Sequence, residues 1–268
     1  MAAPSVVLPL LHGAMGEDGS VRDVLDLLAI PYVGALPSAC RVAFNKPPAK
    51  HIVAAAGAYT PESVVFPHTT FRDLGAGSVL AAVETHFGLP LVVKPTRSGS
   101  ALGCTLVRSS DELPAAMVNA YAYGGVAILE RYVSGVEVAV SVIDTGDGPQ
   151  ALPAVEVVPT GGIYDYQARY TAGETEFFAP ARLSDDVATA AAELALLAHG
   201  SLGLRDLSRT DIIVDDDGRP WFLEVNVAPG LTETSLFPQS ATAAGLDLGL
   251  ILRDLLQLAV LRGPNRPV

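Results

Sequence analysis

The chain has 268 residues, of which 50% are hydrophobic, and a formal net charge of -12 at pH 7. This length and composition predict a globular protein with one large or two to three small domains and exclude a disordered chain. The acidic balance argues against nucleic-acid binding, which needs a basic surface, and no apolar stretch reaches the length of a membrane-spanning helix, so we expect a soluble cytoplasmic protein without nucleic-acid or membrane partners.

The N-terminal residues predict half of a nucleotide-binding α/β unit. Residues 5 to 11, SVVLPLL, are typical of a buried strand, and the glycine-rich loop HGAMGEDGS leads into a helix over residues 21 to 30. The segment from 34 to 60 then predicts a loop and a helix, followed by a short strand, SVVF.

The rest of the chain alternates between strand and helix. A helix over residues 78 to 88 and a strand over 89 to 95 lead into a glycine-punctuated hairpin loop. The remaining predicted elements are a helix at 111–124, strands at 126–133, at 136–144 and early in 150–184, and helices at 185–203 and 247–263. Short alternating blocks of this kind indicate an α/β or α+β layered fold.

The stretch DIIVDDDGRPWFLEVNVAPG, residues 211 to 230, predicts a hairpin with acids on one face. Asp217 and Gly218, between two apolar runs, are typical of a two-residue type I′ turn. The pairs predicted for that loop are Asp211 with Glu224, Arg209 with Asn226, and Asp215 with Pro220. Because side chains alternate along a strand, the opposite, core-facing side is then formed by Ile212, Val214, Trp221, Leu223 and Val225.

Two carboxylates opposed on one face of a sheet repel each other unless a cation offsets their charge. Mg²⁺ typically takes one or two carboxylates, an amide oxygen, waters and substrate phosphates. The alternative is a solvent-facing polar strand, but Arg209 beside the acids and the apolar opposite face favour a site. The hairpin therefore predicts an Mg²⁺ (or Mn²⁺) site at Asp211, Glu224 and Asn226.

A second group of residues has the character of a phosphate-binding loop. Lys94 ends an apolar strand, and the loop after it contains Gly99, Ser100 and Gly103. Glycines let backbone N–H groups approach phosphate oxygens, and a lysine adds a point charge. Downstream, ILERYVSGVE places two glutamates at a strand end and a turn, where they suit an adenine amino group and ribose hydroxyls or are simply solvent-exposed.

Together these segments resemble the D-alanine:D-alanine ligase family of the ATP-grasp enzymes. HGAMGEDGS is similar to the family's H-G-x-x-G-E-D-G loop, KPTRSGSALG to its K-P-x-R-E-G-S-S-x-G loop, and IYDYQARY to its Y-D-Y-x-x-K-Y segment. SRTDIIVDDDG, FLEVNVAPGLTETSLFP and the closing helix resemble its metal and substrate region. The resemblance implies two α+β lobes that grip ATP, at residues 34–132 and 133–268, after a partial Rossmann-like N-terminal domain at 1–33.

The resemblance also implies roles for single residues, and Mg²⁺ ligation by Asp211, Glu224 and Asn226 agrees with the hairpin. The implied ATP contacts are Lys46, Lys94, Glu130, Glu137 and Arg169, the last in place of a lysine. The implied catalytic groups are Ser100, Tyr170, Arg209 and Gly230, and the implied substrate contacts are His12, Ser235 and Leu236. Residues 161 to 180 would form a lid that excludes water.

The function implied is ATP-dependent joining of two D-alanines through an acyl phosphate for peptidoglycan synthesis, in a homodimer as is usual for the family. The chain begins about one β-α-β unit later than the family pattern, so we expect an N-terminally shortened member without the family's substrate-binding glutamate. Two alternatives stay open. One is an ATP-grasp ligase for another amino acid in secondary metabolism, and the other is a nucleotide-binding relative without ligase activity.

Overall fold

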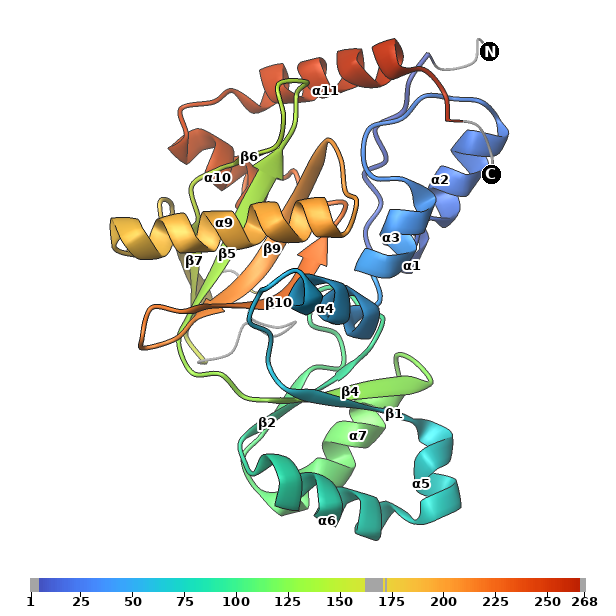
Figure 1. Cartoon of the computed structure of the whole chain (residues 1–268), viewed down its shortest axis with the longest axis vertical. Helices are drawn as coiled ribbons and strands as arrows, with labels where there is room; N and C mark the ends of the chain where they lie inside the picture. Colours follow the sequence, from blue (N-terminus) through green and yellow to red (C-terminus); the bar gives the residue numbers. More distant parts are fainter. Residues whose placement is uncertain (1–4, 162–170, 172, 266–268) are drawn as a thin grey trace.

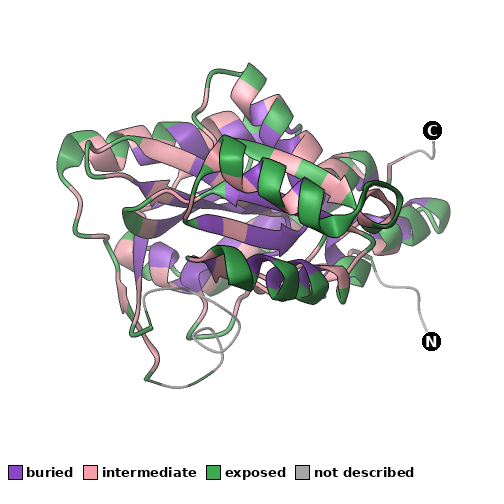
Figure 2. Cartoon of the chain, turned by 90° about the horizontal axis from the view of Figure 1, so that it is seen from below, coloured by how far each residue is buried: buried purple, intermediate pink, exposed green. Residues whose placement is uncertain are grey.

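Two antiparallel sheets with packed helices form the computed structural model, which describes residues 5–161, 171 and 173–265 (Figure 1). The smaller sheet has the strand order β1-β4-β2-β3, and the larger has the order β10-β9-β5-β7-β8 with β6 paired to β5. Buried residues gather along the sheets, whereas the outer faces of the helices are exposed (Figure 2). The mixed, layered architecture predicted from the sequence is therefore confirmed.

The smaller lobe combines the four-stranded sheet with the helices that follow its strands. Its strands are β1 (Ser63–Pro67), β2 (Leu91–Pro95), β3 (Thr105–Val107) and β4 (Val126–Arg131), and its helices are α5 (His68–Leu74), α6 (Ala76–Phe87), η1 (Ser110–Glu112) and α7 (Leu113–Tyr121). Apolar residues of α6 and α7, such as Val83 and Met117, pack against Leu91 and Leu129 of the sheet. This packing fixes the strand ends that reach the site.

The larger lobe is built on the six-stranded sheet. Its elements are β5 (Val136–Ile143), β6 (Gln150–Ala151), β7 (Val155–Pro159), β8 (Thr175–Phe178), α9 (Asp185–Ser201), β9 (Leu207–Val214), β10 (Pro220–Asn226), α10 (Leu236–Ala243) and α11 (Leu248–Arg262). Helix α9 is alanine-rich and starts with two aspartates, which favour a helix N-terminus. It packs on Val138 and Ile212, and α11 packs around Ile143 and Leu207.

Between residues 5 and 62 the structure contains helices but no extended strand. Helices α1 (Ala14–Glu17), α2 (Ser20–Leu27), α3 (Pro37–Ala43) and α4 (Lys46–Ala55) follow one another. The predicted strand at 5–11 is wrong in extent, since only Val7 forms a bridge, parallel to Tyr32. Pro9 has no N–H for a ladder, and Leu10 and Leu11 are exposed.

The domain boundaries follow from which sheet each element packs on, and we propose them on that basis. Strand β4 ends at Arg131 and β5 begins at Val136 in the other sheet, so the lobes meet near residues 132 and 133. Helices α3 and α4 lie within the predicted 34–132 lobe, but their apolar residues join the core of the larger sheet. We therefore propose that the smaller lobe begins near β1.

The hairpin between β9 and β10 has a three-residue loop rather than the predicted two-residue loop. Asp215 N–H donates to Arg219 O (3.0 Å), and Gly218 has the positive φ (79°) that this loop needs. Pro220 therefore lies opposite Val214 and not opposite Asp215 as predicted. The Asp215 carboxylate accepts from the Trp221 indole (2.8 Å), which holds the loop in place.

An irregularity between Phe222 and Glu224 restores the predicted register at the far end of the hairpin. Asp211 pairs with Glu224 and Arg209 with Asn226, as predicted, because Leu223 forms a β-bulge. The bulge also changes the core face: Phe222 is fully buried, whereas Leu223, predicted to face the core, lines the ligand cavity. Trp221 likewise leaves the predicted core face and packs on Tyr59.

Several elements were not predicted from the sequence: α1 and β3 lie in predicted loops, and two helices, α3 and α4, lie where one was expected. Helices α5 and α10 are short, and β8 lies inside the segment expected to be irregular, where it pairs with β7. In the part of the chain that the structure describes, no helix has the length and apolar character to span a bilayer.

Candidate active site

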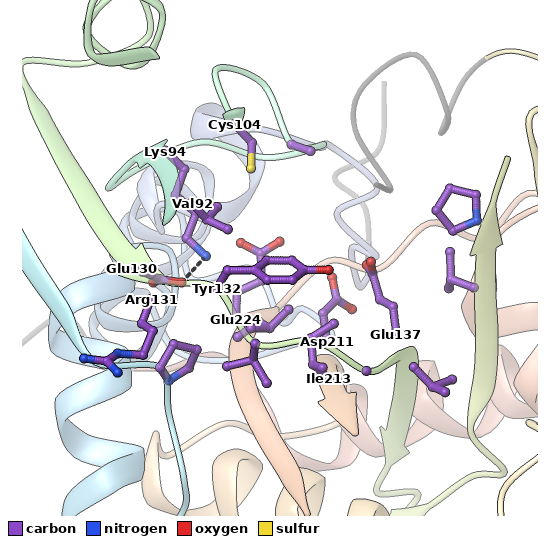
Figure 3. Close-up of a pocket in the computed structure, with 18 of the residues that line it drawn as sticks. Val92, Lys94, Cys104, Glu130, Arg131, Tyr132, Glu137, Asp211, Ile213 and Glu224 are labelled. Atoms are coloured by element: carbon purple, nitrogen blue, oxygen red, sulfur yellow. Dashed lines mark ion pairs between the residues drawn. The ribbon is translucent and has the colours of Figure 1, made fainter. Parts of the chain in front are cut away.

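A cavity of about 410 Å³ lies where the two sheets face each other (Figure 3). Strands β2 and β4 line it from the smaller lobe, and β5, β7, β9 and β10 line it from the larger. The predicted site residues among its lining are Lys46, Lys94, Glu130, Glu137, Asp211 and Glu224. Apolar side chains including Val92, Ile213 and Leu223 complete a wall suited to a flat aromatic group.

At the smaller-lobe end, Glu130 is held by two lysines. Lys50 Nζ donates to Glu130 Oε1 (2.7 Å), and Lys94 Nζ lies 2.8 Å from Glu130 Oε2. All three residues are buried. Burial works to raise the pKa of Glu130, but the two ammonium groups outweigh it and hold that pKa below its ordinary value. The carboxylate is therefore ionised, and each oxygen keeps a lone pair for a further donor.

At the larger-lobe end, the predicted metal ligands are paired with cations. The Arg209 guanidinium binds Asp211 with two hydrogen bonds (2.7 and 2.9 Å). Lys46 Nζ lies 3.0 Å from Glu224 Oε2 and donates to Ser98 O (2.9 Å). These cations offset the repulsion between the opposed acids.

Asn226 connects this cluster to a residue that the sequence did not single out, Glu17. The Asn226 amide oxygen accepts from Arg209 Nη2 (2.7 Å), and Nδ2 donates to Glu17 Oε1 (3.3 Å). This orientation is required because an arginine only donates. In this orientation the Asn226 amide oxygen lies 3.4 Å from Asp211 Oδ2. These two oxygens therefore face a common space.

Glu17 lies in helix α1 and is buried beside the acids of the larger lobe. Its pKa is raised to about 7, mainly by burial; the Gly13 N–H that donates to Oε2 (2.8 Å) opposes the rise, and the charge of Glu224 contributes to it. Buried Arg22 donates to Gly16 O (2.5 Å) and Val227 O (3.4 Å), so it holds α1 against the chain that follows β10. Glu17 stands within the quoted motif HGAMGEDGS, which was the only sequence signal for it.

Lys50 was also missed as a site residue. It lies one helical turn after Lys46 on α4, and residues four apart share a helix face. The scarcity of lysine, with three in the chain, was a signal that each one has a specific role.

The loop between β2 and β3 adopts an unusual backbone. Ser100 and Ala101 both have positive φ (53° and 55°), which costs energy for residues with a Cβ. Such strain is typical of functional loops. Ser98 and Ala101 line the cavity, and Gly99 lies beside Glu17, since a Cβ there would come 3.5 Å from Oε2.

Gly230 and Ser235 form a separate close contact at the start of α10. A Cβ on Gly230 would lie 2.5 Å from Ser235 Oγ, so a larger residue here would require the Ser235 side chain to shift. Ser235 precedes the helix at its N-cap position and exchanges a hydrogen bond with Thr232 (2.8 Å). Leu236 is buried with Ala139 and Val157 of the larger sheet.

The remaining predicted residues are not placed in the cavity. His12 is exposed and is not part of the lining. Arg169 and Tyr170 lie outside the described residues, as do the other residues of 162–170 and residue 172 in the predicted lid segment.

The donor set at the larger-lobe end suits a hard cation. Asp211, Glu224 and Asn226 offer oxygen atoms only, which Mg²⁺ prefers. Among the residues that the structure describes, no group of three or more His, Cys, Asp or Glu side chains is placed to bind a metal by itself. A cation at this position would therefore depend on oxygens from a bound phosphate as well as from the protein.

Two α+β lobes with lysines and opposed acids around a cavity between them define the ATP-grasp class. Solved structures agree: the VanG D-Ala:D-Ser ligase from Enterococcus faecalis matches 95% of this chain and 73% of its own, with a TM-score of 0.85 at 30% identity. The D-alanine-D-alanine ligase from Coxiella burnetii matches 97% of this chain and 69% of its own, with a TM-score of 0.83 at 25% identity.

Sequence comparison narrows the class to a family. The family described as D-ala D-ala ligase C-terminus matches residues 52–257. D-alanine–D-alanine ligase from Anaeromyxobacter sp. (strain K) is 40% identical over 96% of this chain and 80% of its own, and that from Pelotomaculum thermopropionicum is 38% identical over 93% and 78%. The chain belongs to the D-alanine–D-alanine ligase family.

Proposed function

We propose that this protein is an ATP-dependent ligase that joins two D-alanines to form D-alanyl-D-alanine for peptidoglycan synthesis. The observation that carries the proposal is the pair of acids, Asp211 and Glu224, opposed across a hairpin in a cavity that is also lined by Lys94. Family membership supplies the substrate class, because the relatives are named D-alanine–D-alanine ligases.

The proposed reaction has two steps, and in each the cations and N–H groups of the site can neutralise the negative charge on the reacting oxygens. A carboxylate oxygen of the first D-alanine attacks the γ-phosphorus of ATP, and ADP leaves. The amine of the second D-alanine then attacks the acyl carbon, loses a proton and expels phosphate. Lys46 and Lys94 line the cavity, and Arg209 is paired with Asp211, which lines it as well, so we propose that these three cations hold the phosphoryl oxygens.

We propose that Asp211, Glu224 and Asn226 hold Mg²⁺ together with the ATP phosphates. When bound, the cation neutralises phosphate charge. The ion pairs in the present structure mean that Lys46 would leave Glu224 and Arg209 would leave Asp211, so that both cations turn to the phosphoryl group. Glu137 would accept from ribose hydroxyls, and Glu130 with the apolar wall would bind the adenine.

The second substrate is proposed to bind near Gly230 and Ser235. A carboxylate there would meet the Ser235 hydroxyl and the free N–H groups at the start of α10. The backbone N–H of Gly230 is proposed to stabilise the oxyanion of the tetrahedral intermediate.

The test is substrate-dependent turnover of the full chain. With ATP, Mg²⁺ and D-alanine, we expect ADP, phosphate and D-alanyl-D-alanine in equal amounts, and none of them when EDTA replaces Mg²⁺. A panel of D-serine, D-lactate, L-alanine and other amino acids determines the specificity. Product with another amino acid alone would favour a ligase of different specificity, and no amino-acid-dependent phosphate release would contradict both ligase assignments.

We also propose that the protein is a homodimer and is located in the cytoplasm. Sedimentation velocity across a range of protein concentrations tests the dimer, and a single monomeric species at all of them would contradict it.

A further inference from the structure

Lys50 is a buried cation that the proposed reaction does not use. It lies 3% exposed on α4 and contacts Glu130 at 2.7 Å, but it is not among the residues that line the cavity. Lys94 contacts the other oxygen of the same carboxylate at 2.8 Å and does line the cavity. The two lysines thus hold one acid from opposite sides, one facing the protein interior and the other facing the ligand.

The geometry of the sheet explains why Lys94 and Glu130 meet. Val92 of β2 pairs directly with Glu130 of β4, so Lys94, two residues further along β2, lies on the same face and diagonal to the glutamate. Lys50 approaches from helix α4, outside that sheet. In the close-up of the cavity, Lys94 and Glu130 point toward each other (Figure 3).

We propose that Lys50 is a positioning residue: it serves as the permanent counter-ion of Glu130 and thereby leaves Lys94 free to turn to the phosphates of ATP. The inference rests on the proposed function, since it assumes that the cavity binds a nucleotide. Its physical basis is the cost of an unpaired buried carboxylate. With Lys50 in place, Glu130 keeps a partner when Lys94 moves away, whereas without Lys50 the movement would leave Glu130 uncompensated.

The charges in the cluster agree with this division of roles. Glu130 is ionised and carries one negative charge against two lysines, so one positive charge is in excess. Burial lowers the pKa of Lys50 to about 8, with Lys94 also lowering it and Glu130 opposing both. At neutral pH Lys50 therefore remains protonated, and Lys94 supplies the excess charge at the cavity wall.

The experiment measures the ratio of ATP affinity to adenosine affinity by calorimetry on the purified full chain. Adenosine has no phosphates, so the ratio isolates the phosphate contribution and cancels changes at the base. For Lys50→Met we expect the ratio to fall by about 10-fold or more, with adenosine affinity changed by less than about 3-fold. His51→Ala, an exposed neighbour on the same helix, is the matched control and should keep the wild-type ratio.

The same substitution in a Glu130→Gln protein distinguishes a positioning role of Lys50 from a general effect on folding. In a Glu130→Gln protein there is no buried charge to compensate, so adding Lys50→Met should leave the ratio unchanged within about 2-fold. This comparison remains decisive if Lys50→Met alone does not fold. An unchanged ratio in Lys50→Met, or an equal loss in the Glu130→Gln background, would overturn the inference, whereas a wild-type chain that binds no ATP would instead overturn the proposed function.

Discussion

The two ends of the cavity hold the same kinds of side chain in opposite proportions. At the smaller-lobe end, two lysines surround the single acid Glu130. At the larger-lobe end, Lys46 and Arg209 face Asp211, Glu224 and, once it ionises, Glu17. One end thus has a cation in excess and the other has an acid in excess.

This difference indicates what each end is suited to bind. All of these acids except Glu17 have a cation within 3.0 Å. Judged only by whether each acid has a partner, both ends would therefore look like ordinary structural ion pairs. The excess charge distinguishes them, because a surplus lysine favours a phosphate and a surplus carboxylate favours a further cation. ATP with a bound divalent cation presents both partners at once.

The largest expected effect comes from removing an acid at the larger-lobe end. Glu224→Ala should lower kcat by about 100-fold to 1000-fold and weaken the dependence on Mg²⁺, because a proposed metal ligand is lost. Steady-state turnover over a Mg²⁺ titration measures both. Asp216→Ala, at an exposed acid in the turn of the same hairpin, is the control, and a Glu224→Ala enzyme with normal turnover and Mg²⁺ dependence would remove the metal assignment.

The burial of Lys50 at the smaller-lobe end should produce a pH dependence of stability. The pKa of Lys50 is lowered from 10.5 to about 8 in the folded protein. Between these values the unfolded chain binds more protons than the folded one, so the free energy of unfolding should rise with pH, by at most about 3 kcal/mol.

Urea unfolding of wild type and Lys50→Met at about pH 7.5 and about pH 10 measures this term as a difference, since other titrating groups are common to both proteins. Relative to Lys50→Met, the wild type should gain stability at the higher pH. An identical difference at the two pH values would mean that Lys50 does not carry the shifted charge.

Removal of Lys94, the cation at the cavity wall, should weaken ATP binding more than it lowers the stability of the fold. Lys94→Met should weaken ATP binding by about 10-fold to 100-fold, since a hydrogen bond from a charged donor to phosphate is lost while Glu130 keeps Lys50. Competition with a fluorescent nucleotide provides the measurement. Arg108→Ala, an exposed cation in the same lobe, should bind ATP normally, and an equally normal Lys94→Met would place the phosphates elsewhere.

The smallest expected effect concerns Glu137 of β5, which also lines the cavity. Glu137→Gln should weaken ATP binding by about 3-fold to 10-fold, because an amide accepts a ribose hydroxyl less strongly than a carboxylate does. The exposed Glu176 provides the control, as Glu176→Gln. If ATP and 2′-deoxy-ATP respond equally to Glu137→Gln, the 2′-hydroxyl is not its partner.

The hairpin shows how far sequence reasoning reaches and where it stops. The pairing of Asp211 with Glu224 was predicted correctly, but from a two-residue loop that the protein does not have. A longer loop shifts the register by one, and the bulge at Leu223 shifts it back. Neither the longer loop nor the bulge has a sequence signal as strong as the Asp217-Gly218 turn. Their effects on the register cancel, so the predicted pairing of the acids was still correct.

Contacts between distant parts of the chain limited the prediction of the site. Glu17 meets Asn226, and Lys50 meets Glu130, only after the lobes have folded. Residue type and spacing predicted Lys94 and the hairpin acids because both lie on strands whose alternation can be read directly. The partners of these residues come from other elements, and one sequence contains no measure of that proximity.

Helix α4 has a mechanical consequence for the relation between the two lobes. Within a single helical turn it extends one ammonium group to Glu224 of the larger sheet and another to Glu130 of the smaller sheet. The first turn of the helix is thus linked by ion pairs to both sheets. If the two lobes rotate apart, either one of these two ion pairs must lengthen or α4 must move with one lobe. The angle between the lobes is therefore coupled to whether Lys46 and Lys50 keep their glutamate partners.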